Sequence, residues 1–173
     1  MSRLVEELKV DHFYIRQVLG RVKDRNLTTS ERFEIFITAK ALLLSHLDKE
    51  NQELYPVLRY AAQIDHQSQS TLETFEKDML GIASQATGFF CKYASLDTVN
   101  SEIEADPNYA VELARSLETL TTLLGRRLGL EELSLYPVYD CIVGKGSRLA
   151  VELQVQDDIG GARLIHIPID KMA

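Results

Sequence analysis

The sequence HLDKENQELYPV at residues 46–57 has a close counterpart, RLGLEELSLYPV, at residues 127–138. Both stretches contain the pattern Glu-x-x-x-Leu-Tyr-Pro-Val, which begins at Glu50 in the first copy and at Glu131 in the second. A repeated pattern of this length indicates two similar helical segments that each present a glutamate to the same kind of environment.

The two copies differ four residues before the glutamate, where the first has His46 and the second has Arg127. Residues four apart lie on one face of a helix, so His46 and Glu50 can bind one ion together. Arg127 cannot serve as a ligand, because a guanidinium offers only hydrogen-bond donors and stays charged. The pattern therefore predicts one intact and one altered copy of a metal-binding motif.

Apolar residues recur at helical spacing in four segments, and Asp106-Pro107 supplies an N-cap and a proline at the first position of the last segment. We expect Pro56 and Pro137 to kink or end their helices. The stretch Ala94 to Asp106 lacks periodicity and is expected to be a loop. The predicted helices run from about residue 3 to residue 20 or one turn beyond, from Thr28 through residue 57, from about 64 to 93, and from 107 through 138.

Four amphipathic helices of this length predict an all-α fold, an up-down antiparallel four-helix bundle over residues 1–143. Residues 144–173 form a separate extension in which apolar and polar residues alternate on both sides of Asp157-Asp158-Ile159-Gly160-Gly161. This alternation predicts a short C-terminal β-hairpin, which must pack on the bundle or on a partner chain because an isolated hairpin is marginal in water. A homodimer through this extension is therefore one expected assembly.

The composition excludes several classes of partner. The net charge of −7 argues against a nucleic-acid-binding surface. No signal peptide and no apolar run long enough to cross a bilayer are evident, so we expect a cytoplasmic protein without a membrane span.

Three of the four histidines, His12, His46 and His66, lie in the predicted bundle near carboxylates. His12 falls within the apolar stripe of its helix, whereas 100° per residue places His66 nearly opposite the stripe of its own. Whether His66 turns inward stays open. A buried imidazole beside a buried carboxylate is costly unless something satisfies both, and a cation does so directly.

These residues resemble the hemerythrin-like, or HHE cation-binding, domain family over roughly residues 4 to 140. The resemblance implies a four-helix bundle that holds a di-iron centre, with two glutamates bridging the irons. By order and context, the matching residues are His12, His46, Glu50, His66 and Glu131. Arg127 stands where the family has a further histidine, which puts the second iron in doubt.

Arg127 lies on the inward stripe of its predicted helix, together with Glu131. We expect its guanidinium to take the place of the second metal between Glu50 and Glu131, since a guanidinium and a carboxylate pair well. The alternative is that Arg127 extends outward from the edge of the stripe. For Tyr55 and Tyr136 we expect packing at helix ends, with hydrogen bonds to groups around a metal as the alternative.

The resemblance implies an iron-binding protein, and mixed imidazole and carboxylate ligands would also suit manganese or zinc. Sensing or a response related to iron, dioxygen or nitric oxide is the expected role, and one metal, two or none would be compatible with the sequence. No separate catalytic dyad is visible, so we name no catalytic residue. The alternative function is a metal-free regulatory or protein-interaction bundle in which Arg127 replaces a metal.

Overall fold

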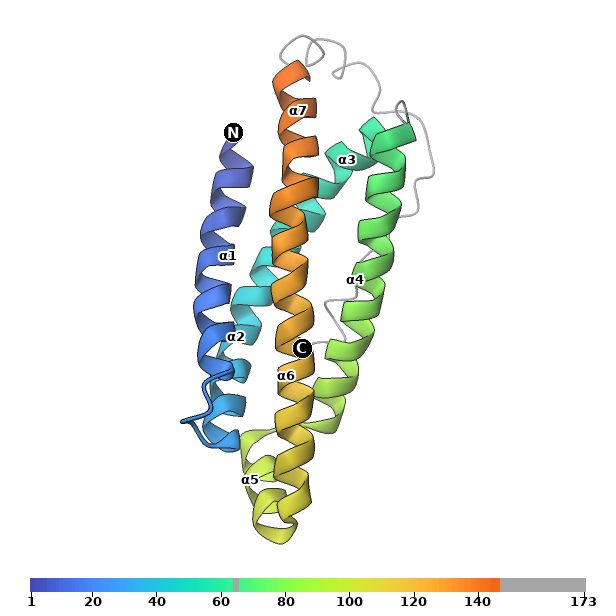
Figure 1. Ribbon diagram of the computed structural model, residues 1–173. Coiled ribbons are helices and arrows are strands. Elements are labelled where there is room, and N and C mark those ends of the chain that lie inside the picture. The colour runs from blue at the N-terminus through green and yellow to red at the C-terminus, as the bar shows by residue number, and fades with distance from the viewer. Residues whose placement is uncertain (64–65, 147–173) are drawn as a thin grey trace.

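The computed structural model describes residues 1–63 and 66–146, without the side chains of residues 66–68, 71, 145 and 146. Within these residues all regular secondary structure is helical, as Figure 1 shows, which confirms the all-α class. The predicted β-hairpin lies outside the described residues. The elements are α1 (Arg3–Val22), α2 (Thr29–Lys49), the π-helical turn η1 (Glu50–Leu54), α3 (Tyr55–Ala62), α4 (His66–Lys92), α5 (Leu96–Ala105), α6 (Pro107–Leu130), the π-helical turn η2 (Glu131–Leu135) and α7 (Tyr136–Gly146).

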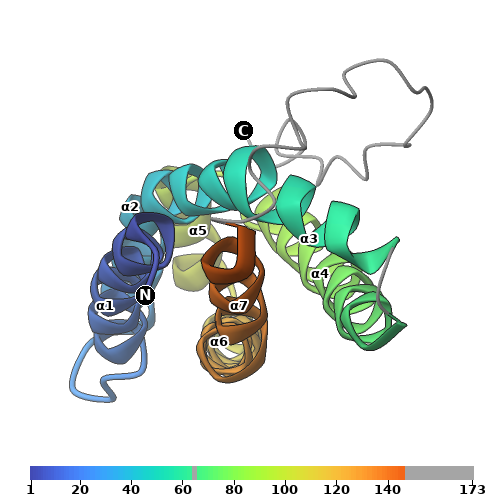
Figure 2. The same ribbon diagram turned by 90° about the horizontal axis from the view of Figure 1, so that it is seen from above.

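Four long helical columns run side by side (Figures 1 and 2). They are α1, the α2–η1–α3 column, α4 and the α6–η2–α7 column, and α6 contacts α1, α2 and α4. The short helix α5 lies at the end where α4 passes into α6 (Figure 1). The helix α7 continues to Gly146, three residues beyond the predicted boundary between the bundle and the extension, and that boundary itself stays a prediction.

The helix starts follow the capping signals in the sequence. Thr28 and Glu31 form a complete capping box at the start of α2. The Asp106 side chain accepts a hydrogen bond from the Asn108 N–H at 2.9 Å, with Pro107 as the first helical residue of α6. The predictions for the second and last helix starts are therefore confirmed.

The expectation of a loop over Ala94 to Asp106 is wrong, because most of it forms α5. The Ser95 side chain caps this helix by accepting from the Thr98 N–H at 3.2 Å. Val99 is fully buried, and Leu96 and Ile103 pack on the same apolar cluster. Three apolar residues at helical spacing are thus enough to stabilise a short acidic helix when they pack against a tertiary core.

The two prolines produce π-helical turns rather than helix ends. Pro56 and Pro137 have no N–H for the carbonyl four residues earlier, so the chain shifts to the wider i→i+5 pattern. The Tyr55 N–H donates to the Glu50 carbonyl, and the Tyr136 N–H donates to the Glu131 carbonyl. Each turn inserts one residue and brings the tyrosine onto the buried face below its glutamate, where both tyrosines are 1% exposed.

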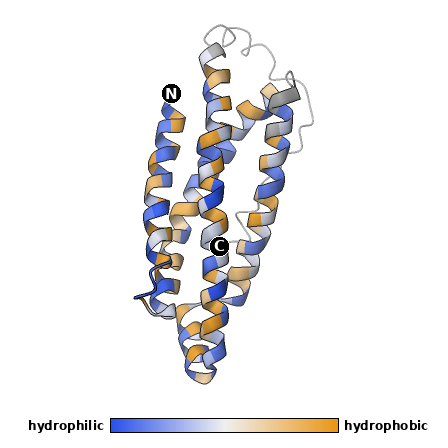
Figure 3. Cartoon of the chain, viewed as in Figure 1, coloured by the Kyte–Doolittle hydropathy of each residue, from blue (hydrophilic) through white to orange (hydrophobic). Residues whose placement is uncertain are grey.

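The core consists of two apolar clusters, and polar residues lie between them. Along α1, Leu8 belongs to one cluster and Ile15 to the other, with His12 between them. Leu128 and Leu135 bracket Glu131 in the same way. Hydrophobic residues recur along each helix between hydrophilic ones (Figure 3), and none of the described helices is long and apolar enough to cross a membrane.

Candidate metal site

Four buried polar side chains meet between the two apolar clusters. One nitrogen or oxygen atom from each of His12, His46, Glu50 and Glu131 lies within 4.8 Å of the corresponding atom of every other. None of the four residues is more than 2% exposed. His12 comes from α1 and His46 from α2, while Glu50 and Glu131 are the first residues of η1 and η2.

The distances suit a single ion. His12 Nε2 lies 3.2 Å from His46 Nε2 and 3.2 Å from Glu131 Oε2, and His46 Nε2 lies 3.8 Å from Glu50 Oε1. Two imidazole nitrogens that bind one ion at about 2.1 Å are separated by about 3.0 to 3.4 Å, depending on the angle between them. The observed nitrogen separation falls in that interval.

A carboxylate lies beside the outer nitrogen of each histidine, within hydrogen-bond distance for His12 and at a longer distance for His46. His12 Nδ1 lies 2.7 Å from Glu132 Oε1, which also accepts a hydrogen bond of 2.6 Å from Arg16. The corresponding Nδ1 of His46 lies 3.6 Å from Asp11 Oδ2, and Lys49 donates to that oxygen at 2.7 Å.

A carboxylate next to Nδ1 favours the tautomer in which Nδ1 carries the hydrogen and Nε2 carries a lone pair. Both histidines therefore direct a lone pair into the space between Glu50 and Glu131. The contact between Glu132 and His12 was not predicted from the sequence. The adjacent pairs Asp11-His12 and Glu131-Glu132 are the signal that could have indicated these contacts.

The centre holds buried polar atoms that lack hydrogen-bond partners. Among the described residues, Glu50 Oε2, Glu131 Oε2 and His46 Nδ1 are buried without a hydrogen-bond partner. Buried polar atoms left unpaired cost roughly 1–3 kcal/mol each, so several in one place call for an explanation. A cation between the two carboxylates and the two imidazoles would satisfy the oxygens directly, so this donor set fits one metal ion.

The hydroxyl groups of the two repeated tyrosines reach this region. The Tyr136 hydroxyl lies 2.8 Å from His12 Nε2 and donates to Glu50 Oε1 at 3.2 Å. Tyr55 accepts a hydrogen bond of 2.6 Å from Arg127. The expectation that these tyrosines only pack at helix ends is therefore wrong, because the π-helical turns rotate them inward.

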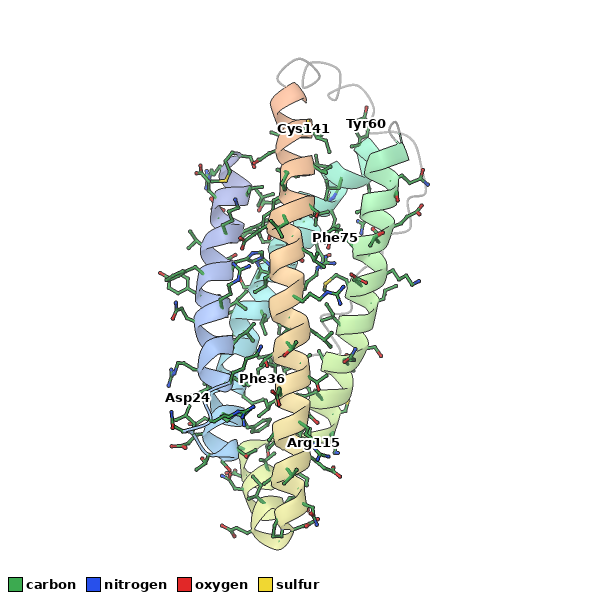
Figure 4. The ribbon with its side chains drawn as sticks, viewed as in Figure 1. Asp24, Phe36, Tyr60, Phe75, Arg115 and Cys141 are labelled. Carbon is green, nitrogen blue, oxygen red and sulfur yellow. The ribbon has the colours of Figure 1, made fainter. Side chains whose placement is uncertain are left out.

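Arg127 is enclosed in the core, with only 4% of its surface exposed. Its Nε donates to Glu131 Oε1, and a second nitrogen donates to the Phe75 carbonyl at 2.8 Å. The guanidinium carbon also lies 4.5 Å from the centre of the Phe75 ring, which points from α4 toward the α6–α7 column in Figure 4. The prediction of an inward Arg127 is confirmed and the outward alternative is wrong.

The position of Arg127 differs in one detail from the expected one. Its hydrogen bonds in the described part of the chain go to Glu131, Phe75 and Tyr55, and none goes to Glu50. The guanidinium therefore lies on one side of the carboxylate pair rather than between the two carboxylates.

The two buried carboxylates, Glu50 and Glu131, differ in how far neighbouring positive charge stabilises them. Burial lowers the pKa of His46 to about 4, so this histidine is neutral near pH 7. Burial, reinforced by the neighbouring Glu131 charge, raises the pKa of Glu50 well above its ordinary value. For Glu131 burial acts in the same direction, but a hydrogen bond from His12, in the tautomer that carries the hydrogen on Nε2, and the Arg127 guanidinium outweigh it and lower the pKa. Arg127 thus stabilises one carboxylate, and the other has no comparable cation beside it.

The structure brings together four of the five predicted site residues. The fifth, His66, is the first residue of α4, but its side chain lies outside the described part of the structure. Its direction is therefore still a matter of prediction.

The comparison with protein families gives a match over most of the chain. The family model described as the hemerythrin HHE cation-binding domain matches residues 3–139. This range contains the four clustered residues and agrees closely with the resemblance inferred from the sequence. Neither the comparison with curated proteins nor the comparison with solved structures gives a match.

Proposed function

The chain belongs to the family of hemerythrin HHE cation-binding domains, and on that premise we propose that it binds one metal ion through His12, His46, Glu50 and Glu131. The observation that carries this proposal is the convergence of two imidazole lone pairs and two carboxylates on one buried point. Acceptors that face each other repel, and a bound cation turns that repulsion into attraction.

We propose iron as the resident metal, because the family is known for it and because imidazole and carboxylate ligands suit it. Manganese and zinc share much of this ligand preference. A bound iron would supply a redox-active centre, while the chain orients the two imidazoles through Glu132 and Asp11 and encloses them between apolar clusters.

We propose that Arg127 replaces the second metal of the family. Its charge compensates Glu131, and its remaining hydrogen bonds are made by Phe75 and Tyr55, so the guanidinium occupies this side of the site as a permanent cation. The arrangement favours a mononuclear centre and argues against reversible dioxygen carriage of the kind that uses two irons.

The proposed role is sensing, or a response to iron, dioxygen or nitric oxide. A cavity of about 40 Å³ lies between α2, α4 and α6, and apolar side chains such as Met79, Ala83 and Ala86 line it. The same cavity reaches His46 and Glu131. A small cavity lined mainly by apolar side chains supports a small uncharged ligand.

The architecture completes the proposal. We take the four columns as the antiparallel four-helix bundle of residues 1–143, with residues 144–173 as an extension that packs on the bundle or joins two chains in a homodimer. The cytoplasm is the proposed location.

The test is elemental analysis of protein that has been purified without chelator after expression with iron, manganese and zinc supplied. We expect about one metal ion per chain, and substitution of two ligands together, His46→Ala with Glu131→Gln, to abolish it. The control is His166→Ala, a histidine outside the proposed ligand set. Two ions per chain would contradict the role of Arg127.

The second candidate function is a metal-free regulatory or interaction bundle. The hydrogen bonds that all three Arg127 nitrogens form favour it, since an arginine can hold a carboxylate in a core without metal. Absence of every tested metal from the purified protein, together with unchanged stability on metal addition, would favour this function over the first.

A further inference from the structure

The outward face of α1 carries a group of exposed apolar side chains. Val10 is 54% exposed, Phe13 58% and Tyr14 56%. The rings of Phe13 and Tyr14 contact each other edge to face, with centroids 5.5 Å apart. These residues lie opposite the side of α1 that buries His12 and Ile15, so the fold leaves them without a partner from the neighbouring helices.

Charged residues lie at both ends of this group. Glu6 and Arg21 are both exposed, and within the described range neither forms an ion pair. Glu6 and Arg21 lie on opposite sides of the midpoint between Phe13 and Tyr14. Each is 7.5 residues, or about 11 Å along the helix, from that midpoint. The face therefore has an acidic end and a basic end at equal distances from an aromatic centre.

We propose that this face of α1 binds a second copy of the chain, with the two α1 helices antiparallel about a two-fold axis between Phe13 and Tyr14. In that arrangement Glu6 of each copy lies opposite Arg21 of the other, and the aromatic side chains of both copies meet at the centre. Val10 then lies opposite Gln17. An isologous contact requires a self-complementary surface of this kind.

Both ends of this face lie near the surface. Arg3, at the end that carries Glu6, forms an ion pair of 2.7 Å with Glu7 of the same helix. Asp24 lies in the loop after α1, and Figure 4 shows it at the outer edge of the molecule, where a partner could reach it. Figure 2 places α1 at the rim of the helical columns, which leaves its outer side accessible.

The contact should be weak. A pair of helices of 20 residues has a length of about 30 Å, and such an interface lies at the small end of those that hold proteins together. We therefore expect dissociation in the micromolar range rather than an obligate dimer.

The test is sedimentation velocity of the full chain from about 1 to about 300 µM. The unchanged protein should shift from monomer to dimer over this range, and Phe13→Glu should remain a monomer. Glu6→Arg and Arg21→Glu should each weaken the dimer by about tenfold or more, since each places like charges opposite one another at two symmetric positions.

The single charge variants separate this geometry from a parallel pair, and mixing them tests whether the two charged positions meet across the contact. Glu6→Arg and Arg21→Glu together form a mixed dimer in which every charged pair is again attractive, so mixing should restore association, as should both substitutions in one chain. In a parallel pair of helices, residue 6 of one copy would meet residue 6 of the other. Every variant would then pair like charges, as the unchanged protein does, so neither single substitution would weaken the dimer.

The matched control is Glu34→Arg, an exposed glutamate of α2 away from this face. Far-ultraviolet circular dichroism verifies that each variant remains helical. The proposal is overturned if the protein stays monomeric throughout the range, whether because residues 147–173 cover the face or because nothing binds it. It is equally overturned if a dimer persists in Phe13→Glu or if mixing restores nothing.

Discussion

His12 and His46 face each other with their Nε2 atoms 3.2 Å apart, although they lie on different helices 34 positions apart in the chain. If each outer nitrogen holds its hydrogen toward a carboxylate, both inner nitrogens present lone pairs to the same space. Such a contact is unfavourable by itself and becomes favourable when a cation lies between the lone pairs. The predictions below concern this cation, the groups that orient its ligands and the arginine beside it.

Metal binding should stabilise the folded protein. A ligand that binds only the folded state adds about 2.7 kcal/mol when its free concentration is a hundred times its dissociation constant. For a chain of this size, each kcal/mol raises the melting temperature by roughly 2–4 °C. Differential scanning calorimetry of chelated and metal-loaded protein should therefore show a rise of about 5–10 °C. His46→Ala should abolish the rise, and an equal rise in that variant would place the ion elsewhere.

The carboxylates beside the Nδ1 atoms of His12 and His46 should increase metal affinity. Replacing Glu132 by Gln, or Asp11 by Asn, should weaken binding by about 10- to 100-fold, because each change removes the charge that orients a ligand histidine and makes it more basic. Competition with a chromophoric chelator measures the affinity. Asp48→Asn, on an exposed residue of α2 that bonds Gln52, is the control and should bind as the unchanged protein does.

Removing the buried arginine should destabilise the fold. Arg127→Ala should lower the free energy of unfolding by about 3–5 kcal/mol, because it leaves the Glu131 charge buried without its cation. Urea denaturation measures the loss. The neighbouring Arg126→Ala, at an exposed position, should change it by less than about 0.5 kcal/mol. A loss below about 1 kcal/mol for Arg127→Ala would show that the pair contributes no more than a surface ion pair.

Replacing the arginine by a ligand should change the number of metal ions. Arg127→His returns an imidazole to the position where the family has one, so we expect metal content to rise from about one toward two ions per chain. Elemental analysis and the absorption band of a bridged iron pair report the change. If neither appears, Arg127 does not occupy a vacated ligand position or His66 does not complete the second site.

The hydroxyl of Tyr55 should contribute through the arginine. Tyr55→Phe removes the acceptor for one Arg127 nitrogen and leaves that donor buried, which costs about 1–3 kcal/mol of unfolding free energy. Tyr60→Phe, on an exposed tyrosine of the same helix, should have little effect. Equal stability of the two variants would mean that water replaces the lost acceptor.

The helices and the ligand candidates could be predicted from the sequence for different reasons. Periodic apolar residues and caps such as Thr28 and Asp106 gave helix starts, because these signals act within one turn of the chain. The helix α5 was missed because its apolar residues Leu96, Val99 and Ile103 are few among acidic ones. Its stability depends on the core against which it packs.

The surroundings of the site could not be predicted in the same way. A regular helix of 100° per residue turns Tyr55 and Glu132 away from the centre, and this assumption fails where a proline forces a π-helical turn. The extra residue rotates Tyr55 and Tyr136 inward, and Glu132 meets a histidine that lies 120 positions away.

The sequence by itself determined which residues can bind an ion and where an arginine breaks the pattern, because ligand chemistry belongs to the residue type. It also determined that His46 and Glu50 share a helix face, since four residues make about one turn. Only the tertiary structure decided that His12, His46, Glu50 and Glu131 converge on one point. It also decided that Arg127 pairs with the Glu131 carboxylate and not with that of Glu50, because contacts between helices depend on packing and on the two π-helical turns.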